Sequence, residues 1–258
     1  DDANTPNVSD VYTTSLNTLG VSYDIWDVME DGPVVTPTLT PYHTVIWFTG
    51  DDLTETIQTD DEAALMGFLN QGGKLFLSSQ HYLSDVGDVN DFMEMYLYIN
   101  TVQNNIGATN IAGVAGHAIG DGLGPYPLSP TAGEADRLNP VTPGGQAAFV
   151  NENDTTVAIS FTDGESCSLF GAFPFERLAA GDAEELMDSF LTWPCWDPSI
   201  QIDPEQVSAP LWTAGESSER VNVANPGEGK LTWVVNSGPI HLWSVTDTDG
   251  QVPTFLNN

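Results

Sequence analysis

Residues 43–52 of this 258-residue chain read HTVIWFTGDD, and this stretch decides the fold. Four apolar residues stand in a row at 45–48, and a glycine with two aspartates then ends the run. Parallel strands that are covered on both faces show such continuous apolar runs, whereas half-exposed strands alternate apolar and polar residues. The stretch therefore predicts a central strand of a parallel sheet that ends in a polar loop.

The segments on either side continue an alternation of strands and helices. Downstream, Thr59 to Glu62 reads as a capping box that opens a helix, and residues 74–78 read as the next strand. Upstream, residues 7–19 read as a helix and residues 21–28 as a strand. This alternation favours a parallel sheet flanked by helices.

The later part of this α/β region is less regular. Residues 88–99 read as a helix, and residues 100–145 read as an elaborated loop region with short strands. We expect strands at 146–150, 155–161 and 168–173, followed by a closing helix at 182–192.

A domain boundary is predicted at residues 193–198, which read WPCWDP, because the two prolines cannot continue a helix. Beyond it the hydrophobic period changes from 3.6 to 2, as in a small β-sandwich. We therefore expect an α/β domain over 1–195 and a β domain over 196–258. The expected strands of the second domain are 207–212, 220–224, 230–235 and 241–245.

The charge of the chain argues against binding to nucleic acid, and its apolar runs argue against insertion into a membrane. Five Lys and Arg residues stand against 37 Asp and Glu residues, a formal net charge of −32, so the surface would repel a phosphate backbone. No apolar run approaches the roughly 20 residues of a membrane helix, so we expect no membrane insertion. An acidic, lysine-poor surface suits saline or calcium-containing external media. We expect a secreted, extracellular protein, free or attached to a cell surface.

The two cysteines, Cys167 and Cys195, form the smallest set that can make a disulfide. Closing this loop would stabilise the fold by about 3.5 kcal/mol in the chain-entropy model. Two buried free thiols are the alternative.

Four segments in order carry a family resemblance: DDANTPN at 1–7, GVSYDIWDV at 20–28, VIWFTGDD at 45–52 and GGKLFLSSQ at 72–80. Together they resemble the class I glutamine amidotransferase-like domain, a flavodoxin-like three-layer α/β fold that recurs in large secreted bacterial proteins. The resemblance covers residues 1–195. Residues 216–233 resemble the immunoglobulin-like domains of bacterial surface proteins, but the region is shorter than the about 100 residues of a complete domain.

The resemblance also implies where catalytic residues would stand. Family members carry a Cys nucleophile on the turn after the strand that corresponds to 74–78, and a His and a Glu after a late strand. Here the turn holds Ser79, the expected His position holds Pro174, and Glu176 remains. Covalent catalysis of the family type lacks its thiolate and its activating imidazole. We therefore expect the fold without the activity.

The resemblance further implies that an apolar strand precedes the Asp1–Asp2 pair and lies inside the sheet. A sheet without an interior strand leaves two rows of unpaired backbone groups. We expect the sheet to be completed by a protein partner, by another subunit, by a cleaved N-terminal peptide, or by a longer form of this chain.

Four carboxylates, those of Asp1, Asp2, Asp51 and Asp52, are expected at the carboxyl ends of neighbouring strands. Such a cluster could bind Ca²⁺, which prefers six to eight oxygen ligands. The alternative is a set of solvated, helix-capping acids. No other cofactor is expected.

Two weaker predictions concern a serine hydrolase site and N-glycosylation positions. Ser79 with His81, His117 or His43 could form a serine hydrolase, although no Gly-x-Ser-x-Gly motif surrounds the serine. Surface histidines beside a polar strand end are the alternative. Asn7 and Asn153 fit the pattern for N-glycosylation, which is common by chance.

The sequence thus supports one leading interpretation and two alternatives. The leading one is a non-catalytic extracellular module that acts in attachment or assembly within a larger secreted protein. The first alternative is a degenerate or accessory hydrolase that uses Ser79 and a carboxylate. The second is a calcium-stabilised module that binds glycans or proteins.

Overall fold

A computed structural model describes residues 1–2, 7–132, 134–195, 201–203 and 222–224. The described helices are α1 (Ser9–Thr18), α2 (Val28–Asp31), α3 (Thr36–Leu39), α4 (Thr59–Leu69), α5 (Tyr82–Val86), α6 (Asp91–Met95), the 3-10 helix η1 (Phe175–Arg177) and α7 (Ala180–Thr192). The strands are β1 (Thr44–Phe48), β2 (Lys74–Ser78), β3 (Ile99–Gln103), β4 (Ala108–Gly113), β5 (Tyr126–Ala132), β6 (Arg137–Pro140), β7 (Gln146–Asn151), β8 (Thr156–Thr162), β9 (Cys167–Gly171), β10 (Gln201–Asp203) and β11 (Asn222–Ala224).

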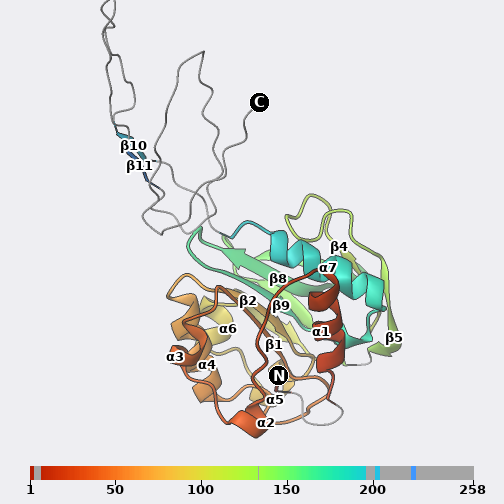
Figure 1. The fold of residues 1–258 in the computed structure, drawn as a ribbon. Coiled ribbons are helices and arrows are strands. Elements are labelled where there is room, and N and C mark those ends of the chain that lie inside the picture. The colour runs from red at the N-terminus through yellow and green to blue at the C-terminus, as the bar shows by residue number, and fades with distance from the viewer. Residues whose placement is uncertain (3–6, 133, 196–200, 204–221, 225–258) are drawn as a thin grey trace, which may run out of the picture.

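Seven strands of the described residues form one mixed sheet in the order β1-β2-β9-β8-β7-β4-β5 (Figure 1). The β1–β2 and β2–β9 pairs are parallel, as the apolar runs predict. From β9 onward every pair is antiparallel, so the prediction of a parallel sheet holds for only one side of the sheet. The turn between β7 and β8 is short, and only antiparallel neighbours can be joined by such a hairpin.

Two apolar layers cover the two faces of the parallel part. On one face, Ile46, Phe48 and Phe76 pack with α1 and α7, which lie together in Figure 1. On the other face, Trp47 and Leu77 pack with α3, α4 and α6. The α7 stripe of Ala183, Leu186, Met187 and Phe190 is buried, as its spacing predicts. This arrangement is a mixed α/β fold with helices on both faces of the parallel part of the sheet, and it is compatible with the flavodoxin-like fold that the sequence predicts.

Several element predictions need correction. Residues 21–27 form no strand, because the Val21 N–H bonds back to the Leu16 carbonyl of α1 and the segment makes no strand ladder; at its other end the Trp26 carbonyl accepts from the amino group of Asp1. The predicted helix 88–99 is only α6, and Tyr98 has a left-handed φ of 55° that a helix does not allow before β3 begins. The capping box of α4 lies one residue earlier than predicted, between Gln58 and Asp61.

The predicted short strands within 100–145 are present as β3, β4, β5 and β6. Past Cys195, the described residues form the antiparallel β10–β11 pair, and β11 lies within the strand predicted at 220–224. The predictions for 207–212, 230–235 and 241–245, and with them the β-sandwich, lie outside the described residues. Within the described ranges, none of the helices has the length and apolar character needed to cross a membrane.

Candidate functional site at the carboxyl ends of the parallel strands

The parallel strands β1, β2 and β9 bring three loops to one edge of the sheet. The loop after β1 carries Asp51 and Asp52, the turn after β2 carries Ser79, and the segment after β9 carries Glu176. The structure thus brings Asp51, Asp52, Ser79 and Glu176 to one edge of the sheet, and open α/β sheets bind their ligands at this edge.

Ser79 is held in place rather than presented to solvent. Its side chain is 2% exposed, and its Oγ accepts hydrogen bonds from Thr49 Oγ1 at 2.7 Å and from the Tyr82 N–H at 3.1 Å. Its own N–H donates to the Gly171 carbonyl on β9 at 3.1 Å. A hydroxyl oxygen has two lone pairs, and both are engaged here. The serine thus serves to join the ends of all three parallel strands.

The structure brings none of the predicted histidines into hydrogen-bond contact with Ser79. His81 Nε2 lies 3.3 Å from Glu134 Oε2, in an ion pair if the ring is protonated. His117 Nε2 lies 2.8 Å from Ser160 Oγ, and its Nδ1 accepts the N–H groups of Ile119 and Gly120. Because Nδ1 is an acceptor, His117 carries its proton on Nε2, and burial lowers its pKa. His43 is exposed at the start of β1.

The ion pair of Asp51 and Arg177 lies beside the Ser79 turn. Asp51 Oδ1 accepts hydrogen bonds from Gln80 Nε2 and from Arg177 Nη2, the latter at 3.0 Å. Glu176 is half-buried, and Tyr12 on α1 donates to its Oε2 at 3.4 Å. Burial, followed by the nearby charge of Asp51, raises the pKa of Glu176 to about 7. A carboxyl group with such a pKa can exchange a proton near neutral pH.

Three of the four predicted calcium ligands, Asp1, Asp2 and Asp51, accept hydrogen bonds from protein side chains. Asp2 is buried and accepts a hydrogen bond from Trp47 Nε1 at 3.3 Å. Burial and the charge of Asp61 raise the pKa of Asp2 to about 7, which disfavours the ionised form that a cation needs. Among the residues that the structure describes, no group of three or more His, Cys, Asp or Glu side chains could hold a metal ion. The calcium site therefore has no support in the described residues.

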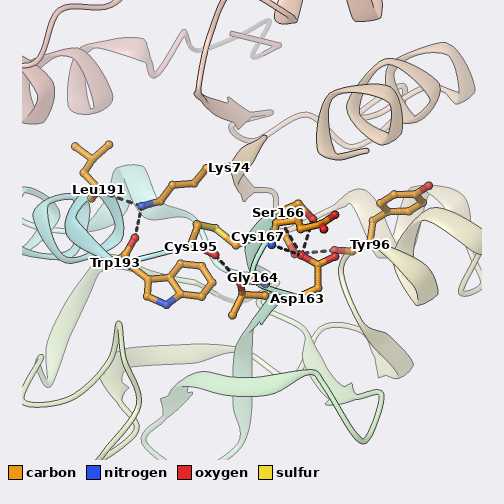
Figure 2. The surroundings of a disulfide bond; sticks show 12 residues. Lys74, Tyr96, Asp163, Gly164, Ser166, Cys167, Leu191, Trp193 and Cys195 are labelled. Carbon is orange, nitrogen blue, oxygen red and sulfur yellow. Dashed lines mark hydrogen bonds between the residues drawn. A yellow bond between two sulfur atoms is a disulfide. The ribbon is translucent and has the colours of Figure 1, made fainter. Parts of the chain in front are cut away.

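Cys167 and Cys195 form a disulfide, with their Cα atoms 5.5 Å apart, as the sequence predicts (Figure 2). The bond ties the start of β9 to the segment after α7. Beside it, the buried Lys74 donates from Nζ to the carbonyls of Leu191 and Trp193, at 3.0 and 2.8 Å. These are C-terminal carbonyls of α7, where a positive charge is favourable. Asn7 and Asn153, the predicted glycosylation positions, are exposed.

Sequence reasoning missed three of the groups that organise this region: Arg177, Tyr12 and the buried Asp136. Asp136 accepts the Asn105 N–H at 2.8 Å, and burial raises its pKa to about 7. The scarcity of basic residues could have indicated Arg177 and Lys74, because they are two of only five in the chain. Tyr12 and Asp136 carry no comparable signal, since tertiary packing alone buries them.

No protein-family model and no curated protein matches the chain. Among solved structures, a cytoplasmic protein of Salmonella typhimurium is similar with a TM-score of 0.52 and 12% identity, over 73% of this chain and 87% of that chain. A Thermoplasma acidophilum protein, provisionally assigned as one component of GMP synthase, gives a TM-score of 0.50 and 11% identity, over 74% and 89%. A β-galactosidase from Bacillus circulans gives 0.51 and 13%, over 77% of this chain and 29% of that one. At these identities the likeness concerns the fold alone.

Proposed function

We propose that this chain is a non-catalytic module of an extracellular protein and that it acts in attachment or assembly. Its α/β part would be a glutamine amidotransferase-like domain that has lost the family chemistry, followed by an immunoglobulin-like β domain. The observation that carries the proposal is that Ser79, which stands at the position of the family nucleophile, is buried and hydrogen-bonded. Both acceptor positions of its Oγ are engaged, its side chain is buried, and no histidine contacts it among the described residues.

Two further features support an extracellular role. The Cys167–Cys195 disulfide is compatible with an oxidising compartment. The net charge of −32 keeps the protein soluble and repels nucleic acid and anionic membranes. A module of this kind would act through the surfaces it offers to other proteins, because its covalent chemistry is absent.

The test is a comparison of the wild type with Ser79→Ala on glutamine, ester, amide and glycoside substrates. We expect both proteins to give background rates on every substrate. A matched variant, Ser79→Cys, restores the family nucleophile, and we expect its thiol to resist alkylation by iodoacetamide because the site is buried. Turnover that disappears in Ser79→Ala would overturn the proposal.

One observation favours a degenerate hydrolase as the second candidate: Glu176 keeps a pKa near 7, and its Oε1 is buried without a hydrogen-bond partner among the described residues. A carboxyl group poised in this way is suited to general acid–base catalysis. If this candidate is correct, turnover should follow a pH profile with an inflection near 7 that Glu176→Gln removes. A rate unaffected by Glu176→Gln would exclude it.

A further inference from the structure

A cavity of about 300 Å³ lies between the turn after α5 and the strand β3. Residues 87–89 line it on one side, and residues 100–102 and Asn104 line it on the other. Its volume is at the lower end of the range for ligand pockets. None of the lining residues belongs to the site at the carboxyl ends of the parallel strands. We call this cavity the β3 pocket.

The first wall of the β3 pocket is a turn that hydrogen bonds hold in place. Gly87 ends α5 with a left-handed φ of 84°, which turns the chain toward α6. The Val89 N–H donates to Asp88 Oδ1 at 2.9 Å. Asn90, the N-cap of α6, donates from Nδ2 to Glu62 Oε1 at 2.6 Å. The exposed Asp88 therefore stands on a fixed turn.

The second wall is the strand β3. It pairs with β6 on one side and, among the described residues, with no strand on its other side. Side chains of consecutive strand residues point to opposite faces, yet residues 100, 101 and 102 all line the β3 pocket. The pocket therefore borders the edge of the strand. Thr101 Oγ1 accepts a hydrogen bond from Asn139 Nδ2 at 2.6 Å, which ties this wall to β6.

Two valines give the β3 pocket an apolar surface. Val89 and Val102 line it from opposite walls, and both are half-buried. They pack against the apolar layer that contains Trp47 and Leu77. This surface suits the methylene chain of a long polar side chain, which gains from apolar contact while its polar head is hydrogen-bonded.

A polar atom of the pocket lining lacks a hydrogen-bond partner. Asn104 Oδ1 is buried, and no group among the described residues donates to it. Leaving a buried acceptor without a donor is unfavourable, so a ligand that supplies an N–H or O–H there gains affinity. The carboxylate of Asp88 is a second acceptor on the lining. The β3 pocket thus favours a ligand with several hydrogen-bond donors.

The charge around the pocket favours a cation. Residues 84–94 read SDVGDVNDFME, with four acidic residues and no basic one. None of the lining residues is basic. Arg137 on β6 is the register partner of Gln103 and is not a lining residue. The net charge of −32 raises the local concentration of cations further.

We propose that the β3 pocket binds the guanidinium group of an arginine side chain from a peptide or protein partner. A guanidinium carries a permanent charge and five N–H donors in a planar fork, so it can serve Asp88 and Asn104 Oδ1 together. Its methylene chain would lie on Val89 and Val102. A lysine ammonium is a compact charge with three donors and matches this lining less well. The inference does not rest on the absence of catalysis at Ser79.

The experiment titrates the isotope-labelled full chain with N-acetyl-arginine-amide and follows binding by NMR. Salt at about 150 mM screens diffuse attraction to the acidic surface. We expect a saturable shift of the Asn104 side-chain amide and of the Val102 backbone amide. N-acetyl-citrulline-amide keeps the shape but lacks the charge, and we expect it to bind at least about 10-fold more weakly.

Two matched variants locate the site. Asp88→Asn should weaken binding of the arginine compound by about 10-fold, because it removes the charged acceptor. Asp91→Asn removes an exposed acid of the same segment that does not line the pocket, and it should change the affinity less than about 2-fold. Asn104→Ala should weaken binding by about 5-fold. Because Asp88 is exposed, Asp88→Asn decides the question even if Asn104→Ala does not fold.

Free arginine distinguishes a peptide from the amino acid as the source of the group. We expect it to bind no more tightly than the blocked form, because its carboxylate would lie near the acidic turn. Tighter binding of free arginine would overturn the assignment to a peptide.

Three other outcomes would overturn the proposal. The absence of a saturable shift at Asn104 would mean that the pocket does not take the group. Equal affinity for the arginine and citrulline compounds would mean that the pocket does not recognise the charge. Equal losses in Asp88→Asn and Asp91→Asn would mean that diffuse attraction, and not the β3 pocket, accounts for binding.

Discussion

The turn at Ser79 and the outer edge of β1 both belong to the parallel part of the sheet. The polar groups of the turn are hydrogen-bonded within the protein, whereas those on the outer edge of β1 are not paired by described backbone. At the turn, the Ser79 hydroxyl is buried and bonded to the loop after β1 and to α5. At the edge, the groups of Thr44 and Ile46 have no outer backbone partner among the described residues, and Ile25 is exposed nearby. The closed region is where catalysis was expected, and the open one is where an interior strand was expected.

This difference indicates where to look for function. A saturated, buried serine contributes to stability, because freeing it would leave Thr49 and the Tyr82 N–H unpaired. An open strand edge with apolar neighbours contributes to recognition, because it gains stability only when it is covered. We therefore assign a structural role to the Ser79 turn.

The largest effect should come from the Cys167–Cys195 disulfide, which lies at the end of the parallel strands opposite the Ser79 turn. Replacing both Cys167 and Cys195 by Ala should lower the free energy of unfolding by about 3.5 kcal/mol and the melting temperature by about 10 °C. Chemical reduction of the wild type should reproduce most of this loss in thermal unfolding. An unchanged melting temperature after complete reduction would show that the bond does not constrain the fold.

The next effect concerns Lys74, which is buried beside the disulfide. Lys74→Ala should cost about 3 kcal/mol, because it opens a cavity and leaves the carbonyls of Leu191 and Trp193 without their donor. Lys74→Met keeps most of the volume and should cost about half as much. Urea unfolding of the two variants checks the order, and equal losses would mean that the hydrogen bonds, not the volume, account for the effect.

A smaller effect is expected in how the free energy of unfolding depends on pH. The pKa of Glu176 is raised to about 7 in the folded protein, so between pH 4.5 and 7 the folded state binds more protons than the unfolded state. Stability should therefore fall as pH rises through this window. Glu176→Gln should reduce that fall by about 2 kcal/mol in unfolding measured at pH 4.5 and 7.

The raised pKa values of Asp2 and Asp136, both about 7, act in the same direction and should leave a residual slope in Glu176→Gln. The exposed Asp91 offers a control, since Asp91→Asn removes a carboxyl group without such burial. A Glu176→Gln variant with the wild-type pH dependence would contradict a raised pKa at Glu176.

The smallest effect is expected at the open edge. Ile25→Ser should change the stability of the unextended chain by less than about 0.5 kcal/mol, because the side chain is already 55% exposed. Urea unfolding of the variant checks this, and a loss above about 1 kcal/mol would show that Ile25 is covered in the folded chain.

The local sequence predicts much of this fold but little of the side-chain pairing. The apolar runs at 45–48 and 74–78 correctly predict β1 and β2. The spacing of apolar residues in 182–192 correctly predicts which side of α7 is buried. The strand predicted at 21–28 is absent, because a strand needs a neighbour along its whole length and periodicity does not report one. Contacts such as Asp51 with Arg177, 126 positions apart, arise only from the tertiary fold.

Residue-resolved amide exchange along β1 of the unextended chain tests the central claim most directly. The account predicts that the Trp47 N–H, which faces β2, exchanges at least about 100-fold more slowly than the Ile46 N–H, which points away from β2. Equal protection at Ile46 and Trp47 would mean that the outer side of β1 is paired, and would contradict an open outer edge of β1.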